Sequence, residues 1–155
     1  NTLPFDDETF DACLASDVLE HLFDPDLSLR EIARVLKEGG RLILNTPFIW
    51  VEHEAPTDAS RYTRYGMRYH LEAAGFSVER VETVVGSIEI VMQLFIEYIR
   101  KLYYSKYIAL NALGDLVLVA PLTLVGVILG KILPLNTTMY GTLVVVAKKN
   151  AAITS

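Results

Sequence analysis

The stretch Leu3–Phe48, LPFDDETFDACLASDVLEHLFDPDLSLREIARVLKEGGRLILNTPF, decides the fold of this chain. It begins with a short apolar run, Phe10–Ser16, which predicts a parallel strand buried on both faces. Directly after this run come four polar residues, Ser16, Asp17, Glu20 and His21. Ligands of open α/β sheets bind outside the carboxyl ends of the strands, so we expect the functional site here.

A helix with clear start and stop signals is predicted next. Asp24 is a good N-cap residue, and Pro25 suits the first helical position. Lys37 is expected in the last turn, where a positive charge favours the helix dipole, and Gly39–Gly40 supply a left-handed end. The run Arg41–Asn45 predicts a second buried strand, so the whole stretch forms one βαβ unit.

This run resembles the second half of the catalytic domain of class I S-adenosylmethionine-dependent methyltransferases, in particular the methyltransferase type 11 group related to ubiquinone and menaquinone biosynthesis enzymes. LPF precedes the fourth strand of that family, FD enters it, LEH follows it, and VLKEGG precedes the fifth strand. The resemblance continues through about Phe76 and resumes at Tyr140–Lys148. It implies a Rossmann-like α/β fold with strands four to seven present and strands one to three missing, together with their glycine-rich loop.

The resemblance also implies which residues contact S-adenosylmethionine. Ser16, Asp17 and Val18 end the first strand, where family members hold the methionine part of this cofactor. Leu3 and Pro4 of the LPF motif are assigned to the cofactor as well. The alternative is that Ser16 satisfies a strand-end amide while Asp17 is solvated. Position favours the cofactor, because a cofactor of this fold passes the end of that strand.

His21 is the candidate catalytic residue. An imidazole exchanges protons near neutral pH, so it could act as general base on an acceptor hydroxyl. An equally weighted alternative is a structural histidine that shapes the cleft. The neighbouring Glu20 is expected to face water. The three histidines, His21, His53 and His70, are scattered along the sequence without the spacing of metal ligands, and no metal site is predicted.

The segment Phe48–Arg61 predicts a loop. Its pattern H-E-x-P-x-D-x-x-R-Y-T resembles a methyltransferase subgroup in which this loop closes over the substrate pocket. The resemblance therefore implies that His53 and Arg61 contact substrate. The alternative is an Asp58–Arg61 pair that stabilises the loop with His53 exposed, and this alternative is favoured for Asp58. Thr63 then predicts the N-cap of a helix that ends at Ala74, and Phe76–Val85 predicts a strand near the sheet edge.

The segment Ser87–Leu135 predicts a hydrophobic helical insertion before the last strand, Thr142–Ala147. Ile88–Tyr107 is expected to form an amphipathic helix. Leu116–Gly130 is apolar but only 15 residues long, shorter than the roughly 18 to 20 that span a bilayer, and Pro121 interrupts it. The insertion either packs within the fold, packs against a second subunit of a homodimer, or lies on a membrane surface.

The charge distribution and the single cysteine indicate which partners and which cellular compartment to expect. The net charge is −5, with −8 over residues 1–85 and +3 over residues 86–155. An acidic first half offers no basic face, so nucleic acid is disfavoured as a partner. The single cysteine, Cys13, predicts a buried thiol in a reducing compartment. The expected location is the cytoplasm, with the insertion peripheral on the inner face of the membrane.

These patterns predict S-adenosylmethionine-dependent methyl transfer to a small-molecule or lipid-linked acceptor. Residues 1–155 are expected to form a partial methyltransferase domain that is inactive alone. The alternative from another class is a non-catalytic membrane- or partner-binding module on a methyltransferase scaffold.

Overall fold

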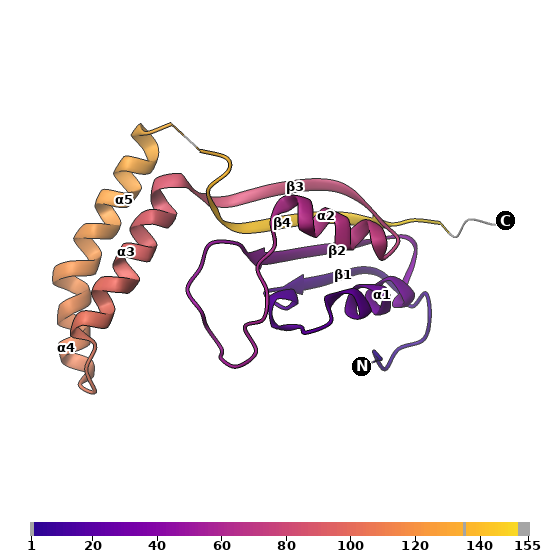
Figure 1. The fold of residues 1–155 in the computed structure, drawn as a ribbon, viewed down its shortest axis with the longest axis horizontal. Helices are drawn as coiled ribbons and strands as arrows, with labels where there is room; N and C mark the ends of the chain where they lie inside the picture. The colour runs from indigo at the N-terminus through magenta and orange to yellow at the C-terminus, as the bar shows by residue number, and fades with distance from the viewer. Residues whose placement is uncertain (1, 135, 152–155) are drawn as a thin grey trace. The chain divides into compact units, whose positions relative to one another are not determined.

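The computed structural model describes residues 2–134 and 136–151 (Figure 1), so residue 135, the end of the predicted insertion, lies outside the described part. The chain forms two compact units: residues 2–48, 52–84 and 142–151 make the first, and residues 49–51 and 85–141 make the second. The elements, in chain order, are β1 (Phe10–Ser16), η1 (Leu19–His21), α1 (Pro25–Val35), β2 (Leu36–Pro47), α2 (Arg64–Ala73), β3 (Phe76–Gly86), α3 (Ser87–Tyr103), α4 (Ile108–Gly114), η2 (Asp115–Val119), α5 (Ala120–Ile132) and β4 (Tyr140–Lys149).

The four strands form one sheet in the order β1-β2-β4-β3. β1 runs parallel to β2, with Ala15 opposite Leu44, as a βαβ unit requires. β4 runs antiparallel to β2, with Val145 opposite Leu44. The last strand therefore lies between the two strands that precede it in the chain. The predicted Rossmann-like α/β class is confirmed.

One face of the sheet carries the core of the first unit. Alternate residues of β2 and β4 are fully buried there, namely Leu42, Leu44, Leu143, Val145 and Ala147. α1 and α2 pack together beside this core, and His70 Nδ1 lies 2.6 Å from Asp26 Oδ1 between them. The expectation that Phe10–Ser16 is buried on both faces is wrong: Leu14 is 71% exposed, and Ala15 alone of these seven residues is buried.

The helix starts are as predicted, and one helix end is not. Asp24 caps α1 by accepting a hydrogen bond from the Leu27 amide at 2.9 Å. α1 ends at Val35, so the prediction of Lys37 in its last turn is wrong. The chain becomes extended at Leu36 because that residue already pairs with the start of β1. Lys37 instead pairs with Asp11 at 2.8 Å.

The predictions for α2 and β3 are confirmed. The Thr63 hydroxyl accepts a hydrogen bond from the Gly66 amide at 3.1 Å, which caps the first turn of α2. Gly75 ends the helix with a φ of +89°, a left-handed conformation that favours glycine. β3 follows at once and forms one edge of the sheet.

In the second unit α3 is followed by one continuous helix made of α4, η2 and α5. It runs from Ile108 to Ile132, 25 residues, and is long and apolar enough to cross a membrane. The expectation of a 15-residue run that is too short is wrong, because helical residues precede Leu116. Pro121 does not end the helix, since the preceding turn, Asp115–Val119, is a wider π-helix that accommodates a residue without an amide N–H.

Candidate functional site

The site begins where β1 ends, in the first unit. Asp17 has a φ of +50°, which turns the chain sharply after the strand. Its amide donates a hydrogen bond to the Asn45 carbonyl at 3.1 Å, and its carboxylate accepts one from the Ser16 hydroxyl at 3.1 Å. Val18, the next residue, leaves 42% of its surface exposed. The predicted cofactor residues Ser16, Asp17 and Val18 thus form one continuous exposed turn.

Glu20 is fully buried, so the expectation that it faces water is wrong. It lies in the short helix η1, which folds beneath the loop after β2. Its backbone carbonyl accepts hydrogen bonds from the amides of Ala59 (2.8 Å) and Ser60 (3.0 Å), which fixes that loop over it. Its Oε2 atom accepts a hydrogen bond from the Thr46 hydroxyl at 3.2 Å. Oε1 is buried without a hydrogen-bond partner in the described part of the chain.

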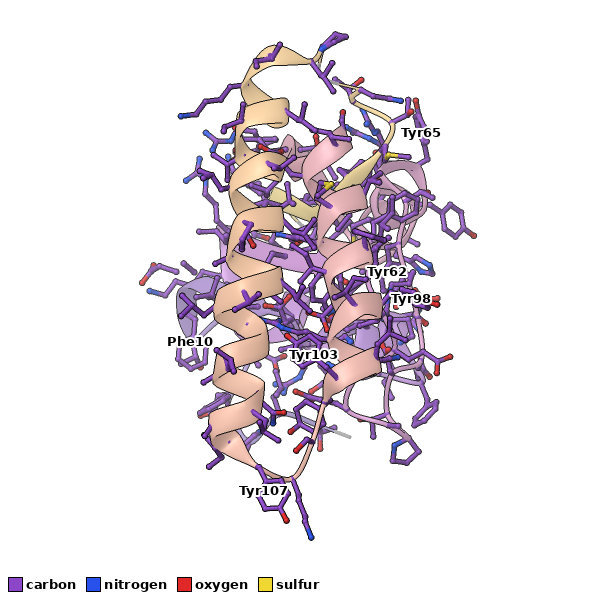
Figure 2. All side chains as sticks on the ribbon, turned by 90° about the vertical axis from the view of Figure 1, so that its left-hand side faces the viewer. Phe10, Tyr62, Tyr65, Tyr98, Tyr103 and Tyr107 are labelled. Carbon is purple, nitrogen blue, oxygen red and sulfur yellow. The ribbon has the colours of Figure 1, made fainter. Side chains whose placement is uncertain are left out.

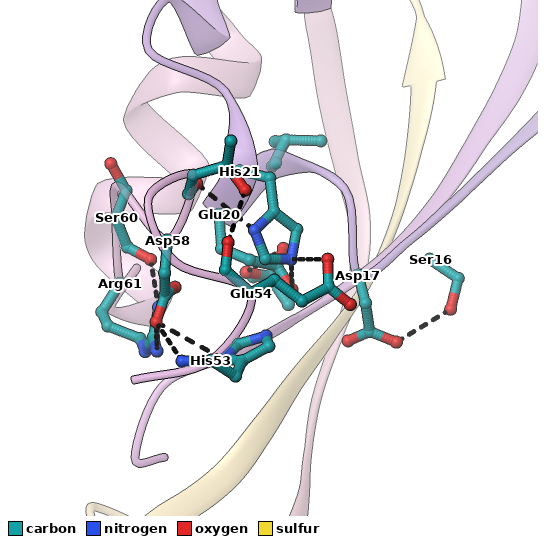
Figure 3. A network of polar contacts seen from close by, with 12 residues as sticks. Ser16, Asp17, Glu20, His21, His53, Glu54, Asp58, Ser60 and Arg61 are labelled. Atoms are coloured by element: carbon teal, nitrogen blue, oxygen red, sulfur yellow. Dashed lines mark hydrogen bonds and ion pairs between the residues drawn. The ribbon is translucent and has the colours of Figure 1, made fainter. Parts of the chain in front are cut away.

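His21 points one ring nitrogen at a carbonyl and the other at carboxylates (Figure 3). Nδ1 lies 3.3 Å from the Thr57 carbonyl oxygen, which can only accept a hydrogen bond. This contact places the proton of a neutral ring on Nδ1 and leaves the lone pair on Nε2. Nε2 lies 3.6 Å from Glu54 Oε2 and 4.0 Å from Glu20 Oε1. The ring can therefore take up a proton at Nε2, next to two carboxylates.

His53 joins this group although it is 32 positions further along the sequence. Its ring lies edge-on to that of His21, with 5.0 Å between the ring centres. Asp58 orients it: the His53 amide donates to Oδ2 at 3.0 Å, and His53 Nδ1 lies 3.4 Å from the same oxygen. Glu20, His21 and His53 each offer one ligand atom within 4.8 Å of the others, the donor types that divalent metals accept.

Asp58 and Arg61 form the pair that was favoured from the sequence. Both terminal nitrogens of Arg61 contact the Asp58 carboxylate, one of them, Nη2, at 2.7 Å from Oδ2. These hydrogen bonds hold the pKa of Asp58 well below its ordinary value, and the same pair raises the pKa of Arg61. Arg61 also donates to the Ser60 carbonyl at 2.9 Å. The Arg61 guanidinium thus forms hydrogen bonds within the loop, to the same Asp58 that contacts His53.

The structure does not bring Leu3 and Pro4 to the same place. The Leu3 amide donates to Glu31 Oε2 at 3.0 Å, and its carbonyl accepts from Arg34 Nη2 at 3.1 Å. Both partners belong to α1, whose last residues lie beside the start of β1 rather than its end. Ser16, the last residue of β1, and Asp17 lie at the other end of that strand, and Figure 3 shows them together with His21, His53 and Arg61.

Sequence reasoning missed Glu54 and Thr57 as partners of His21. The sequence shows the H-E pair at positions 53 and 54, but it does not show how the backbone turns there. Glu54 has a φ of +50°, and the loop closes by a hydrogen bond of 3.1 Å from the Thr57 amide to the Glu54 carbonyl. This turn aims both the Glu54 carboxylate and the Thr57 carbonyl at one imidazole.

Residues 1–44 match the family described as a methyltransferase domain. The resemblance to class I S-adenosylmethionine-dependent methyltransferases is confirmed. Among relatives of this methyltransferase-like chain, the demethylmenaquinone methyltransferase of Corynebacterium kroppenstedtii is 46% identical over 69 residues, which cover 43% of this chain and 28% of the relative. An uncharacterized methyltransferase of Bacillus subtilis is 40% identical over 57 residues, 37% of this chain and 20% of the relative. The matched segments thus span less than a third of these relatives.

Solved structures place the methyltransferase-like fold over nearly the whole chain. The [4+2]-cyclase SpnF has a TM-score of 0.58 at 24% identity, covering 97% of this chain and 53% of SpnF. Phosphoethanolamine N-methyltransferase 2 of Haemonchus contortus, in complex with S-adenosyl-L-methionine, has a TM-score of 0.57 at 16% identity, covering 95% of this chain and 35% of that enzyme. Likeness at these identities shows the shared fold.

The exposed turn after β1 suits a cofactor with the charges of S-adenosylmethionine. This cofactor carries a positive sulfonium, a positive amino group and a negative carboxylate, so its net charge is positive. Asp17 presents a carboxylate at the strand end, and Glu54 presents a second one that is 72% exposed. Val18 adds exposed apolar surface next to Asp17. The donor set therefore fits a cationic ligand with an aliphatic chain.

Proposed function

We propose that this protein transfers the methyl group of S-adenosylmethionine to a nucleophilic atom of a small-molecule or lipid-linked acceptor. The main support is the position of His21: it lies in η1, the short helix that follows the end of β1, where ligands of such sheets bind, and its Nδ1 atom contacts the Thr57 carbonyl. The sequence match over residues 1–44 covers the same strand and helix.

Ser16, Asp17 and Val18 are proposed to hold the cofactor, and Leu3 and Pro4 stay a prediction from the resemblance. The cofactor supplies a methyl group already activated by the sulfonium. The residues of this chain therefore have to position the acceptor, exclude water and remove one proton. The Asp17 carboxylate favours the cofactor's positive charge, and the turn at Asp17 leads the chain from β1 towards η1, which carries His21.

His21 is proposed to remove the proton of the acceptor at Nε2. The hydrogen bond from Nδ1–H to the Thr57 carbonyl keeps the ring in the tautomer that can do so. The imidazolium that forms is stabilised by Glu20, 4.0 Å away and shielded from water. Glu54, at 3.6 Å, adds a second negative charge on the exposed side.

His53 and Arg61 are proposed to contact the acceptor from the loop. Asp58 contacts both of them and so links the two side chains. The names of the relatives include a demethylmenaquinone methyltransferase and a phosphoethanolamine N-methyltransferase, acceptors of different chemistry. The proposal for this protein therefore stays at a small-molecule or lipid-linked acceptor.

The second unit is proposed to place the protein on the cytoplasmic face of a membrane. Three lysines, Lys101, Lys106 and Lys131, lie along or beside its apolar helices, and their positive charges suit anionic headgroups. Cys13 fits a reducing compartment because it has no disulfide partner in the chain, and burial raises the pKa of its thiol.

The test is methyl transfer by the full-length protein with radiolabelled S-adenosylmethionine, compared between wild type and His21→Ala. We expect turnover to fall by roughly 10²-fold with cofactor affinity little changed, because the base is lost while the cofactor turn is kept. His70→Gln is the matched control, since His70 pairs with Asp26 on α1 and should keep wild-type turnover. Wild-type turnover in His21→Ala would falsify the role of His21. No transfer and no cofactor binding by the wild type would favour a non-catalytic module instead.

A further inference from the structure

The helices of the second unit form a hairpin whose two ends meet. The Ser87 amide, at the start of α3, donates a hydrogen bond of 2.9 Å to the Met139 carbonyl, just before β4. The Ser87 hydroxyl donates to the Asn136 carbonyl at 3.2 Å. At the far end a short link joins α3 to α4, and Figure 2 shows Tyr107 at this turn. The chain therefore leaves and returns at one place, with the link at the tip.

The second helix of the hairpin has the dimensions and composition of a membrane segment. Its 25 residues, Ile108–Ile132, correspond to roughly 37 Å at 1.5 Å per residue, more than the roughly 30 Å hydrocarbon core of a bilayer. Its most apolar window has a mean hydropathy of 2.3. Only 11% of that window is buried within the protein. Asp115 and Lys131 are its only charged residues.

Apolar side chains are exposed around the helix rather than along one stripe. Three consecutive residues, Leu116, Val117 and Leu118, are 70%, 59% and 43% exposed. These three lie in the π-helical turn, where consecutive residues point somewhat less than 100° apart, so together they span nearly half of the circumference. A single partner helix, such as one from a second copy of this chain, covers one stripe. Lipid surrounds a helix and covers every exposed side.

The inner face of the hairpin has the close packing typical of helices in lipid. Gly126 and Gly130 form a G-x-x-x-G pair on α5. A Cβ atom at Gly126 would lie 3.1 Å from Met92 of α3, and one at Gly130 would lie 2.6 Å from the Glu89 carboxylate. Small residues at this spacing let two helices approach without relying on the burial of apolar surface from water.

Three charged side chains of the hairpin, Arg100, Glu97 and Asp115, pair with one another. Arg100 of α3 donates to Asp115 of the second helix at 3.1 Å and to Glu97 at 3.0 Å. The Tyr103 hydroxyl donates to the same Asp115 carboxylate at 2.5 Å. Ionisable groups at membrane depth are expected to be paired within the bundle in this way. Tyr104, Lys106 and Tyr107 gather at the tip, a composition suited to a headgroup region.

We infer that this hairpin inserts into a lipid bilayer, entering and leaving through one face with its tip directed at the far headgroups. The inference rests on the membrane contact proposed above and replaces surface attachment by insertion. A segment held only by its positive charges lies at the interface, whereas an inserted hairpin places Leu124 and Ile128 in hydrocarbon. The rest of the protein leaves 61% of Leu124 and 47% of Ile128 exposed. A charged side chain at either position is therefore unfavourable only when lipid surrounds the helix.

The experiment is flotation of the full-length protein with vesicles of phosphatidylcholine and phosphatidylglycerol, followed by washing in high salt and in alkaline carbonate. We expect the wild type to stay with the vesicles through both washes, because insertion does not depend on screened charges. Leu124→Glu/Ile128→Glu should reduce the retained fraction at least tenfold. The matched control, Leu124→Val/Ile128→Val, should be retained. Circular dichroism and methyl transfer in detergent check that the glutamate variant is folded.

Any other result of the flotation experiment overturns insertion, and it does so independently of the methyl transfer proposed above. Release by high salt leaves surface contact in place and rejects insertion. Failure to float, with a dimer seen by light scattering, assigns the exposed face to a second copy of the chain. Equal retention of the glutamate variant places the membrane contact elsewhere. Methyl transfer measured in detergent is independent of all three, so its loss or survival reports on the enzyme alone.

Discussion

The Nε2 atom of His21 lies 4.0 Å from Oε1 of Glu20, a fully buried carboxylate oxygen without a hydrogen-bond partner in the described residues. Burying a carboxylate is unfavourable unless a positive charge compensates it. A proton bound at Nε2 of His21 would place this positive charge next to the Glu20 carboxylate. Glu20 also holds the loop after β2 through its backbone carbonyl, and its side chain contacts β2 through Thr46.

Glu20→Gln tests this relationship. The glutamine side chain can keep the hydrogen bond with Thr46 but carries no charge to stabilise an imidazolium at His21. We expect turnover to fall by roughly tenfold or more, with the Michaelis constant for the cofactor unchanged. Kinetics with varied cofactor at saturating acceptor separate the two constants. A rise in that Michaelis constant together with a lower melting temperature would instead assign Glu20 a structural role.

The Asp58–Arg61 pair predicts how the loop responds to pH. Hydrogen bonds from Arg61 hold the pKa of Asp58 well below its ordinary value in the folded protein. The pair's contribution to stability is therefore fully present above the unfolded-state pKa, about 4, and is lost as the pH falls below that value. Melting temperatures between pH 7 and pH 5 should differ little because of this pair.

Asp58→Asn isolates the effect, since it removes the charge and keeps the size. Below about pH 4 the wild type should lose stability more steeply than the variant, measured by thermal unfolding across the pH range. At neutral pH the variant should also release His53, which Asp58 contacts at 3.4 Å, and weaken acceptor binding. Parallel pH curves for the two proteins would contradict the assignment.

The βαβ unit and the later helix α2 could be predicted from the sequence because each of their signals is local. Asp24 caps its own helix, Thr63 caps the next one, and Gly75 ends it. The end of α1 was misplaced for a non-local reason: Leu36 is extended by its pairing with Phe10 of β1. The exposure of Leu14 could not be predicted either, because a run of apolar residues does not show which elements cover each face of a strand.

The candidate site was only half predictable. His21 and Asp17 were placed correctly at the strand end, because strand ends can be recognised from composition. The approach of His53 to His21 depends on how the chain turns at Glu54, and the H-E pattern carries no signal for that turn. The continuous helix through Pro121 was missed because a proline was taken as a stop, whereas a π-helical turn accommodates it.

Packing of the sheet gives a prediction with a neighbouring control. Leu44 is fully buried between β1 and β4, so Leu44→Ala should lower the free energy of unfolding by about 2 to 5 kcal/mol. Ile43, the preceding residue, points to the opposite face and is 40% exposed. Ile43→Ala should cost less than about 1 kcal/mol. Denaturant unfolding in detergent measures both, and equal costs would show that the second face is covered as well.

Metal removal tests the prediction that no metal takes part. Glu20, His21 and His53 could together hold a divalent cation, which would occupy the lone pair that His21 needs as a base. A methyl group on a sulfonium is activated without a Lewis acid. Dialysis against a chelator should therefore leave turnover unchanged. Loss of turnover that is restored by zinc or manganese, and not by magnesium alone, would replace the base by a metal centre.

The open edge of β1 predicts the behaviour of residues 1–155 produced alone. In the described residues β1 pairs with β2 and with no other strand, and Leu14 on it is 71% exposed. An apolar strand with an unpaired edge invites intermolecular pairing. We expect residues 1–155 to be poorly soluble and not to bind S-adenosylmethionine, and a variant with residues 87–135 replaced by a short linker, which removes the apolar hairpin, to behave in the same way. Leu14→Lys should raise the soluble fraction, whereas Tyr65→Lys, on the exposed side of α2, should not. Calorimetry that shows micromolar cofactor binding by residues 1–155 would refute the expectation, because the end of β1 would then suffice to hold the cofactor.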